Sequence, residues 1–418
     1  MRIKRDRYLN TLIRHMHNGM IKVVTGIRRC GKSYLLFELF YEHLRTSGVD
    51  DEHIIRLALD DRRNAAYRDP DALYGYVCGK IADDGMYYIL LDEVQFVKEF
   101  EDVLNGFLHI RNADTYVTGS NAKFLSKDII TEFRGRGDQI HVYPLSFAEF
   151  MSAFDGSEEY GWRQYMTFGG LPMILSMKDD EDKSRYLQSI LEETYIKDIA
   201  ERGGLRSDAE LEELLDILAS SIGSPTNPKK LSDTFKTLKN KAIHPDTIKR
   251  YIDLLSDAFM VSQARRYDVK GKKYINTPSK YYFTDMGLRN ARLNFRQLEE
   301  SHIMENIVYN ELVMRGYNTD VGVVEKYART EDGKRELRRA EIDFVCNMAD
   351  RRRYVQVTRS LSDESVLCRE FAPLLSVNDA FEKIVIVKDL AHTHYTDDGI
   401  LLLRLSDFLL ASGSDQVF

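Results

Sequence analysis

Long apolar runs are missing from this sequence of 418 residues. The longest, such as YYILL at 87–91 and ILLLRL at 400–405, are far shorter than the roughly 20 residues that cross a bilayer. The N-terminal stretch MRIKRDRYLNTLIRH is charged and lacks the apolar core and cleavage site of a secretory signal. We therefore expect neither a membrane protein nor an exported one.

Cysteine is also scarce. Cys30, Cys78, Cys346 and Cys368 are scattered without paired spacing, which predicts neither a disulfide framework nor a zinc cluster. The sequence shows no internal repeat and no low-complexity segment. These features are typical of a protein that works in a reducing cytoplasm.

The composition is that of a folded globular protein, with 43% hydrophobic and 30% charged residues. The length predicts several domains, because one domain takes about 150 residues. A net charge of -7 would disfavour a nucleic-acid partner if it were spread evenly over the chain. It is not evenly spread, as the basic middle region shows below.

The motif GIRRCGKS at 26–33 stands between a short β-branched strand and an amphipathic helix. In this context Gly26 and Gly31 let backbone amides face phosphate oxygens, and Lys32 reaches the terminal phosphates. Ser33 can offer its hydroxyl to Mg²⁺. The motif predicts an ATP site whose binding residues are Gly26, Arg29, Cys30, Gly31, Lys32, Ser33 and Tyr34.

A second strand, YYILLDE, ends in Asp92 and Glu93 about 60 residues beyond the loop. At that place a P-loop protein carries a metal-binding Asp and a water-activating Glu. We therefore predict that Ser33 and Asp92 hold Mg²⁺ and that Glu93 is catalytic, together with Lys32.

Two further polar groups are candidates for contacts with the nucleotide. Ser120 follows a third strand, TYVTGSNA, and could sense the terminal phosphate, although a plain turn role is nearly as well supported. Arg134 and Arg136 lie in the glycine-loosened segment FRGRGD, from which a guanidinium can reach a nucleotide, including that of a neighbouring subunit.

The segments GIRRCGKS, ILLDE, TGSNA, GRG, YPLSFAEF and FGGLP, in this order, resemble a family of bacterial and archaeal AAA-type ATPases. The resemblance implies a C-terminal part with a winged helix and a fold similar to PD-(D/E)XK nucleases. It also implies that Arg136 is an arginine finger. The expected fold class is α/β: a P-loop NTPase with a parallel sheet, a helical and winged-helix region, and a nuclease-like domain. The expected domains are 1–155, 156–222, 223–290 and 291–418.

The middle of the chain reads as helix, turn, helix and hairpin, which is the winged-helix order. Between residues 228 and 280, Lys and Arg outnumber Asp and Glu by 13 to 5. Such a patch is suited to the DNA backbone, while a protein-docking module or a solvated face would be the plainer interpretation. The candidate DNA contacts are Lys249, Arg250, Arg265, Arg266, Lys270, Lys272 and Lys273.

By the resemblance, Glu305 on a helix and Asp343 on a strand match two acidic positions of a nuclease site. The following strand carries Gln356 and Thr358 where an acid and a lysine would stand. Loss of one negative charge and of the amine weakens both metal binding and water activation. We therefore predict a nuclease fold that binds without cleaving.

The sequence thus predicts a cytoplasmic, homo-oligomeric ATPase that uses ATP and Mg²⁺ and passes its conformational change to a DNA-binding C-terminal part. Two alternatives stay open: a slow ATP-gated switch that docks a protein partner, and an ATP-regulated nuclease in defence or repair.

Overall fold

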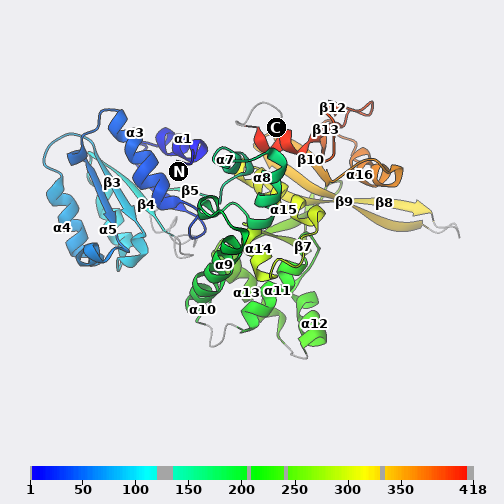
Figure 1. Ribbon diagram of the computed structural model, residues 1–418, viewed down its shortest axis with the longest axis horizontal. Helices are drawn as coiled ribbons and strands as arrows, with labels where there is room; N and C mark the ends of the chain where they lie inside the picture. Colours follow the sequence, from blue (N-terminus) through cyan, green and yellow to red (C-terminus); the bar gives the residue numbers. More distant parts are fainter. Residues whose placement is uncertain (1, 120–134, 205–208, 240–242, 330–334, 412–418) are drawn as a thin grey trace. The chain divides into compact units, whose positions relative to one another are not determined.

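The structure is a computed structural model that describes residues 2–119, 135–204, 209–239, 243–329 and 335–411 (Figure 1). The chain forms two compact units. The N-terminal unit runs to Pro144 and includes the short pieces Leu171–Met173 and Asp257–Phe259. The C-terminal unit takes the rest of the chain from Leu145 onwards. Within the described ranges, no helix is long and apolar enough to span a membrane.

The N-terminal unit is built on a parallel sheet in the order β2-β3-β4-β1-β5. Its strands are β1 (Ile21–Thr25), β2 (Ile54–Ala58), β3 (Tyr87–Asp92), β4 (Ala113–Thr118) and β5 (Gly137–His141). Its helices are α1 (Asp6–Arg14), α2 (Lys32–Tyr34), α3 (Tyr41–Thr46), α4 (Pro70–Lys80) and α5 (Phe100–Phe107). A π-helical segment, Leu35–Phe40, joins α2 to α3.

Helices cover both faces of this sheet, which explains why β1 and β3 are buried along their whole length. In Figure 1, α4 and α5 lie on one side of the sheet, with α1 and α3 on the other. The apolar residues of α4 and α5 share one core with alternate residues of the strands. On the other face Phe40 packs on Tyr116, with ring centroids 4.5 Å apart. The expected strand, loop and helix around residues 22–40 are confirmed, as is the P-loop fold class.

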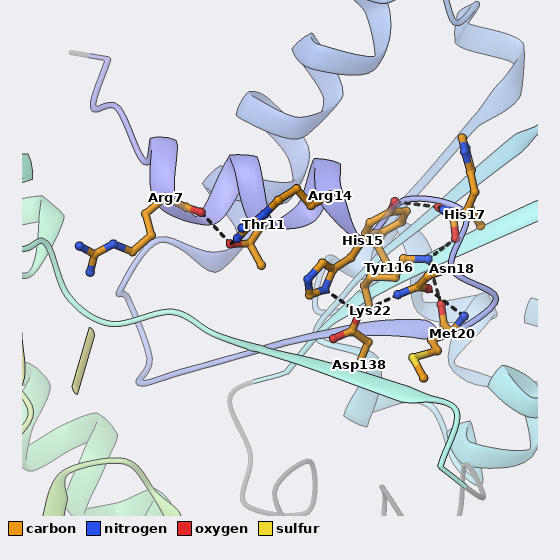
Figure 2. Close-up of polar contacts among 11 residues, drawn as sticks. Arg7, Thr11, Arg14, His15, His17, Asn18, Met20, Lys22, Tyr116 and Asp138 are labelled. Carbon is orange, nitrogen blue, oxygen red and sulfur yellow. Dashed lines mark hydrogen bonds and ion pairs between the residues drawn. The ribbon is translucent and has the colours of Figure 1, made fainter. Parts of the chain in front are cut away.

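The turn between α1 and β1 is fastened to the sheet by polar contacts (Figure 2). The ammonium of Lys22, which is fully buried, pairs with Asp114 and donates to the Met20 carbonyl at 3.0 Å. Asp114 also accepts from the Tyr116 hydroxyl at 2.8 Å, and Asp138 accepts from the Asn18 amide at 2.8 Å. These contacts set the start of β1, the strand that delivers the phosphate-binding loop.

The C-terminal unit begins with a series of helices. They are α7 (Phe147–Met151), α8 (Glu158–Phe168), α9 (Asp180–Ile190), α10 (Lys197–Arg202), α11 (Ala209–Ser220), α12 (Pro228–Lys239) and α13 (Pro245–Asp257). Later helices are α14 (Met286–Arg292), α15 (Glu300–Met314), α16 (Glu364–Leu375) and α17 (Leu405–Leu410). The short helix α14 is an internal anchor, because buried Asn290 donates to the carbonyls of Met166 and Thr167 at the end of α8.

An eight-stranded sheet in the order β12-β13-β11-β10-β9-β8-β6-β7 completes this unit. Its strands are β6 (Val261–Asp268), β7 (Lys273–Phe283), β8 (Asn318–Arg329), β9 (Arg335–Met348), β10 (Arg351–Thr358), β11 (Glu382–Val387), β12 (His394–Tyr395) and β13 (Leu401–Arg404). Phe371 and Leu374 of α16 pack with Ile342 and Tyr354 on one face. On the other, Tyr309 of α15 lies 5.8 Å from Phe344, measured between ring centroids.

The arrangement of the hairpin differs from the modular division expected from the sequence. The helices α12 and α13 and the hairpin β6–β7 form in the expected order. The hairpin, however, shares a sheet with the strands beyond residue 291, because β6 pairs in parallel with β8 from Arg266↔Val321 to Asp268↔Val323. The four-domain division stays a prediction, and the first long segment of the N-terminal unit ends at Pro144.

Candidate functional site

The loop 26–31 emerges from the carboxyl end of β1 and leads into α2. Gly26 (φ 142°) and Gly31 (φ 101°) hold backbone conformations that side chains disfavour. A Cβ at Gly26 would also lie 2.1 Å from the carbonyl oxygen of Val142, so the loop closes only with glycine there. The ammonium of Lys32 lies inside this curl and donates to the carbonyls of Gly26 and Ile27 at 3.0 and 3.2 Å. The loop is thus a preformed cradle with a cation at its centre.

The carboxylate of Asp92 lies beside this loop at the end of β3. It accepts a hydrogen bond from the Ser33 hydroxyl at 3.0 Å and another from the Thr118 hydroxyl at the end of β4. Burial raises the pKa of Asp92 above its usual value, and the two hydroxyl bonds oppose that rise. A carboxylate and a hydroxyl at this distance are hard oxygen donors of the kind Mg²⁺ prefers, so the residues fit that ion.

Glu93 follows Asp92 in a left-handed backbone conformation (φ 53°). Its amide donates to the Thr118 hydroxyl at 3.0 Å, and its carboxylate accepts from the side-chain amide of Gln95. Because of this backbone conformation the strand ends at Asp92, and the side chains of Asp92 and Glu93 are not forced onto opposite faces of the sheet. Thr118 therefore positions both acidic residues.

Thr118 and Gln95 escaped the sequence-based prediction. The signal for Thr118 was present, since it is the last residue of the third strand, and parallel strands end at one edge of the sheet. The prediction chose Ser120 instead. Ser120 and Arg134 lie outside the described residues, so their assignment stays a prediction.

Two uncharged side chains, those of His141 and Cys30, lie near the phosphate-binding loop. Burial, helped by the charge of Lys32, lowers the pKa of His141 to about 3, so its imidazole is uncharged at neutral pH. Its Nδ1 lies 3.2 Å from the Thr25 hydroxyl. Cys30 is fully buried and its thiol donates to the Val142 carbonyl at 3.3 Å. Its side chain therefore braces the loop. Arg29 lies in the loop with a left-handed backbone (φ 62°), and Tyr34 is the last residue of α2.

Arg136 lies at the other edge of the sheet. It directly precedes β5, and its carbonyl accepts from the amide of Ile21, the first residue of β1, at 2.9 Å. Since β1 and β5 are parallel, this is the amino end of both strands, opposite the edge that carries the loop. The backbone of exposed Arg136 thus lies about 15 Å from its own cradle, the length of a five-residue strand.

The basic candidates of the C-terminal unit lie on α13 and the hairpin. Lys249 and Arg250 are exposed on α13, and Arg250 donates to the Gly203 carbonyl. On the hairpin Arg266 is half-buried, while the exposed candidates are Arg265, Lys270, Lys272 and Lys273.

Around the nuclease-like positions the structure shows an amine that the strand motif lacks. Lys280 of β7 reaches Glu305 of α15 at 3.0 Å and Glu341 of β9 at 2.8 Å. Burial disfavours its charge, yet the carboxylates of Glu305, Asp343 and Glu341 outweigh burial and raise the pKa of Lys280. Lys280 and Glu341 were missed, although the alternation in AEIDF places Glu341 two residues before Asp343.

The other members of this cluster are also hydrogen-bonded. Gln356 accepts from the Asp343 amide at 2.6 Å and donates to Glu370 at 2.7 Å, and Asp343 accepts from the Val357 amide at 2.9 Å. Burial, followed by the charge of Glu305, raises the pKa of Asp343 well above its usual value. The hydroxyl of Thr358 lies 3.4 Å from the Ser360 carbonyl, to which it donates. Within the described ranges, no group of three or more His, Cys, Asp or Glu residues is placed to hold a metal ion.

Comparison with known proteins agrees with this geometry. Residues 18–151 match the AAA domain family, and residues 159–299 match a domain of unknown function, DUF8612. The parallel sheet, the loop and the matched model define residues 18–151 as an AAA-type domain with the P-loop fold. A Haemophilus influenzae protein named only as uncharacterized is 33% identical over 415 residues, which are 98% of each chain. The chain belongs to the same family as that protein.

More distant relatives add no function. An uncharacterized Methanocaldococcus jannaschii protein is 26% identical over 388 residues, covering 88% of this chain and 84% of the relative. Among solved structures, the Aeropyrum pernix ORC1 protein in complex with DNA is 12% identical, with a TM-score of 0.32, covering 70% of this chain and 93% of that one. The structure of C. elegans PCH-2 is 12% identical, with a TM-score of 0.27, and the match covers 61% of this chain and 69% of that one. Such scores carry no functional argument.

Proposed function

We propose that the N-terminal unit binds and hydrolyses MgATP. The observation that carries the proposal is the meeting of Lys32, Ser33, Asp92 and Glu93 at the carboxyl ends of β1 and β3. When bound, Mg²⁺ neutralises charge between the transferred and the leaving phosphate. Lys32 binds the terminal phosphates, Ser33 and Asp92 hold the metal, and Glu93 orients and deprotonates the attacking water.

Two substitutions separate binding from turnover. Lys32→Ala is expected to abolish ATP binding, whereas Glu93→Gln retains binding and loses at least about 100-fold in turnover. The matched control is Glu99→Gln, an exposed glutamate with a similar left-handed backbone (φ 49°), which should leave turnover unchanged. Wild-type turnover in Glu93→Gln would refute the role of Glu93.

We further propose that the C-terminal unit binds DNA, mainly through phosphate contacts from α13 and the hairpin β6–β7. The exposure of Lys249, Lys270, Lys272 and Lys273 supports this. The first test is the ATP turnover rate as duplex DNA is titrated, at low and moderate salt. Stimulation that fades with salt is expected, and no stimulation with intact basal turnover would favour a protein partner instead.

For the nuclease-like cluster we propose binding without cleavage. The ammonium of Lys280 lies between Glu305 and Glu341, where it places a fixed positive charge among the carboxylates that a metal would need. Incubation with supercoiled plasmid and Mg²⁺ or Mn²⁺ tests this. Cleavage that disappears in Asp343→Ala would show that the alternative, an ATP-regulated nuclease, is right.

A further inference from the structure

A ladder of arginine and aromatic side chains crosses the sheet of the C-terminal unit from the loop before β11 to β7. Its members, called the aromatic strip, are Arg265, Tyr267, Tyr274, Arg352 and Phe381. Arg352 lies over two rings, with Cζ 5.5 Å from the centroid of Tyr267 and 5.2 Å from that of Phe381. The rings of Tyr267 and Tyr274 meet edge to face at 5.4 Å. These contacts therefore link β10 to β6 and β7, with Arg352 reaching across β9 and β8, which lie between β10 and β6 in the sheet.

The strip is accessible at both ends. Tyr274 is 47% exposed and Phe381 is 40% exposed, so each offers ring surface that the fold leaves uncovered. At the Tyr274 end, Arg265 stacks on the ring with Cζ 4.1 Å from the centroid. The hydroxyl of Tyr274 donates to Asp320 at 2.9 Å, which fixes the ring. Fixed, half-exposed rings are the surfaces on which unpaired bases stack with little entropic cost.

Basic side chains lie within the strip and beside it. Arg265 and Arg352 belong to it, and exposed Lys270 and Lys272 occupy the turn that continues the hairpin beside it. Two acidic groups contact the strip: Asp320 accepts from the Tyr274 hydroxyl at 2.9 Å, and Asp379 accepts from the Phe381 amide at 3.3 Å. A strip of rings flanked by arginine and lysine side chains matches a polymer that carries a phosphate and a base at every step.

We propose that the aromatic strip binds single-stranded DNA by base stacking. A duplex keeps its bases stacked on each other, so it could use the lysines but not the rings. This proposal rests on the proposed DNA binding of the C-terminal unit, and it assigns to the sheet a different form of DNA from the one assigned to α13.

The test uses the full chain and two fluorescent probes, a 20-nucleotide oligo-dT and a 20-base-pair duplex. The variant Tyr274→Ala/Phe381→Ala is expected to bind oligo-dT at least about 30-fold more weakly, since each of the two stacked bases contributes about 1–3 kcal/mol. Its affinity for the duplex should change less than about twofold. Tyr274→Phe keeps the ring and should retain oligo-dT binding. The control Tyr395→Ala removes a 65% exposed ring of β12 outside the strip and should change neither affinity.

The outcomes separate this proposal from the one on α13. Duplex binding that Lys249→Ala/Arg250→Ala weakens, with no binding of oligo-dT, overturns the strip and leaves the helix. Oligo-dT binding that depends on Tyr274 and Phe381, with no duplex binding, supports the strip and overturns the helix. Equal losses in the strip variant and Tyr395→Ala, or tighter binding of oligo-U than of oligo-dT, would also overturn the assignment.

Discussion

At the scale of single residues, Thr118 connects the two acidic groups of the ATP site. Thr118→Val keeps the shape and removes the hydroxyl that donates to Asp92 and accepts from the Glu93 amide. We expect turnover to fall about 10-fold or more with a smaller change in ATP affinity, because the acidic side chains lose their orientation. Steady-state kinetics and nucleotide binding measure the two effects. Thr115→Val, on the opposite face of the same strand, is the control, and an equal effect there would contradict this role.

Asp285, the N-cap of α14, should make the free energy of unfolding depend on pH. Its buried carboxylate accepts from the amides of Gly170 and Leu288 at 2.7 and 3.0 Å, yet burial raises its pKa to about 6. The folded state then binds a proton that the unfolded state has released, so this contribution is full below about pH 4 and is lost as the pH rises through 6. The loss is on the order of 3 kcal/mol.

The variant Asp285→Asn stays neutral, so its stability relative to wild type should rise between pH 4 and 6. Urea unfolding at several pH values measures the difference. Asp363, the N-cap of α16, offers the opposite case, because its hydrogen bonds from Ser365 lower its pKa. Asp363→Asn should therefore lose relative stability as the pH rises through 4. A flat profile for Asp285→Asn would exclude a shifted pKa.

At the scale of elements, the end of α8 depends on a glycine. Gly169 (φ 74°) has no room for a side chain, because a Cβ would lie 2.2 Å from the Asp285 carboxylate, which two amides hold in place. Gly169→Ala should destabilise the C-terminal unit by about 3 kcal/mol. Gly399→Ala has the same φ with nothing within 4 Å and should cost about 1 kcal/mol. Equal unfolding midpoints would refute the steric argument.

The sequence predicted single helices and strands better than it predicted contacts between them. The strands that end at Thr25 and Asp92 were readable because buried apolar runs are followed directly by the loop and the acidic pair. Lys280 was not readable, since its carboxylate partners are 25 and 61 residues away and come from α15 and β9. The pairing of β6 with β8 was hidden for the same reason, because periodicity describes one strand and not its neighbour.

At the scale of the whole molecule, Arg136 decides whether the ATP site is complete in one chain. It leaves the amino end of β5, opposite the cradle, so any role as an arginine finger belongs to the site of a second subunit. Mixing Arg136→Ala with Lys32→Ala should therefore restore turnover, since the intact cradle of one variant meets the intact arginine of the other. Each variant alone should be inactive. No recovery in mixed oligomers, or full activity of a monomer, would remove this role.

The parallel ladder between β6 and β8 limits how the gene can be divided. In a fragment that stops near residue 290, β6 would still pair with β7 on one side. Its other side, which pairs with β8 in the full chain, would expose a row of unpaired backbone amides and carbonyls. Such an open strand recruits other chains, so truncation there should give aggregates and not a soluble DNA-binding module. A cut near residue 144 leaves both sheets whole, and expression vectors built on that boundary are the ones to try.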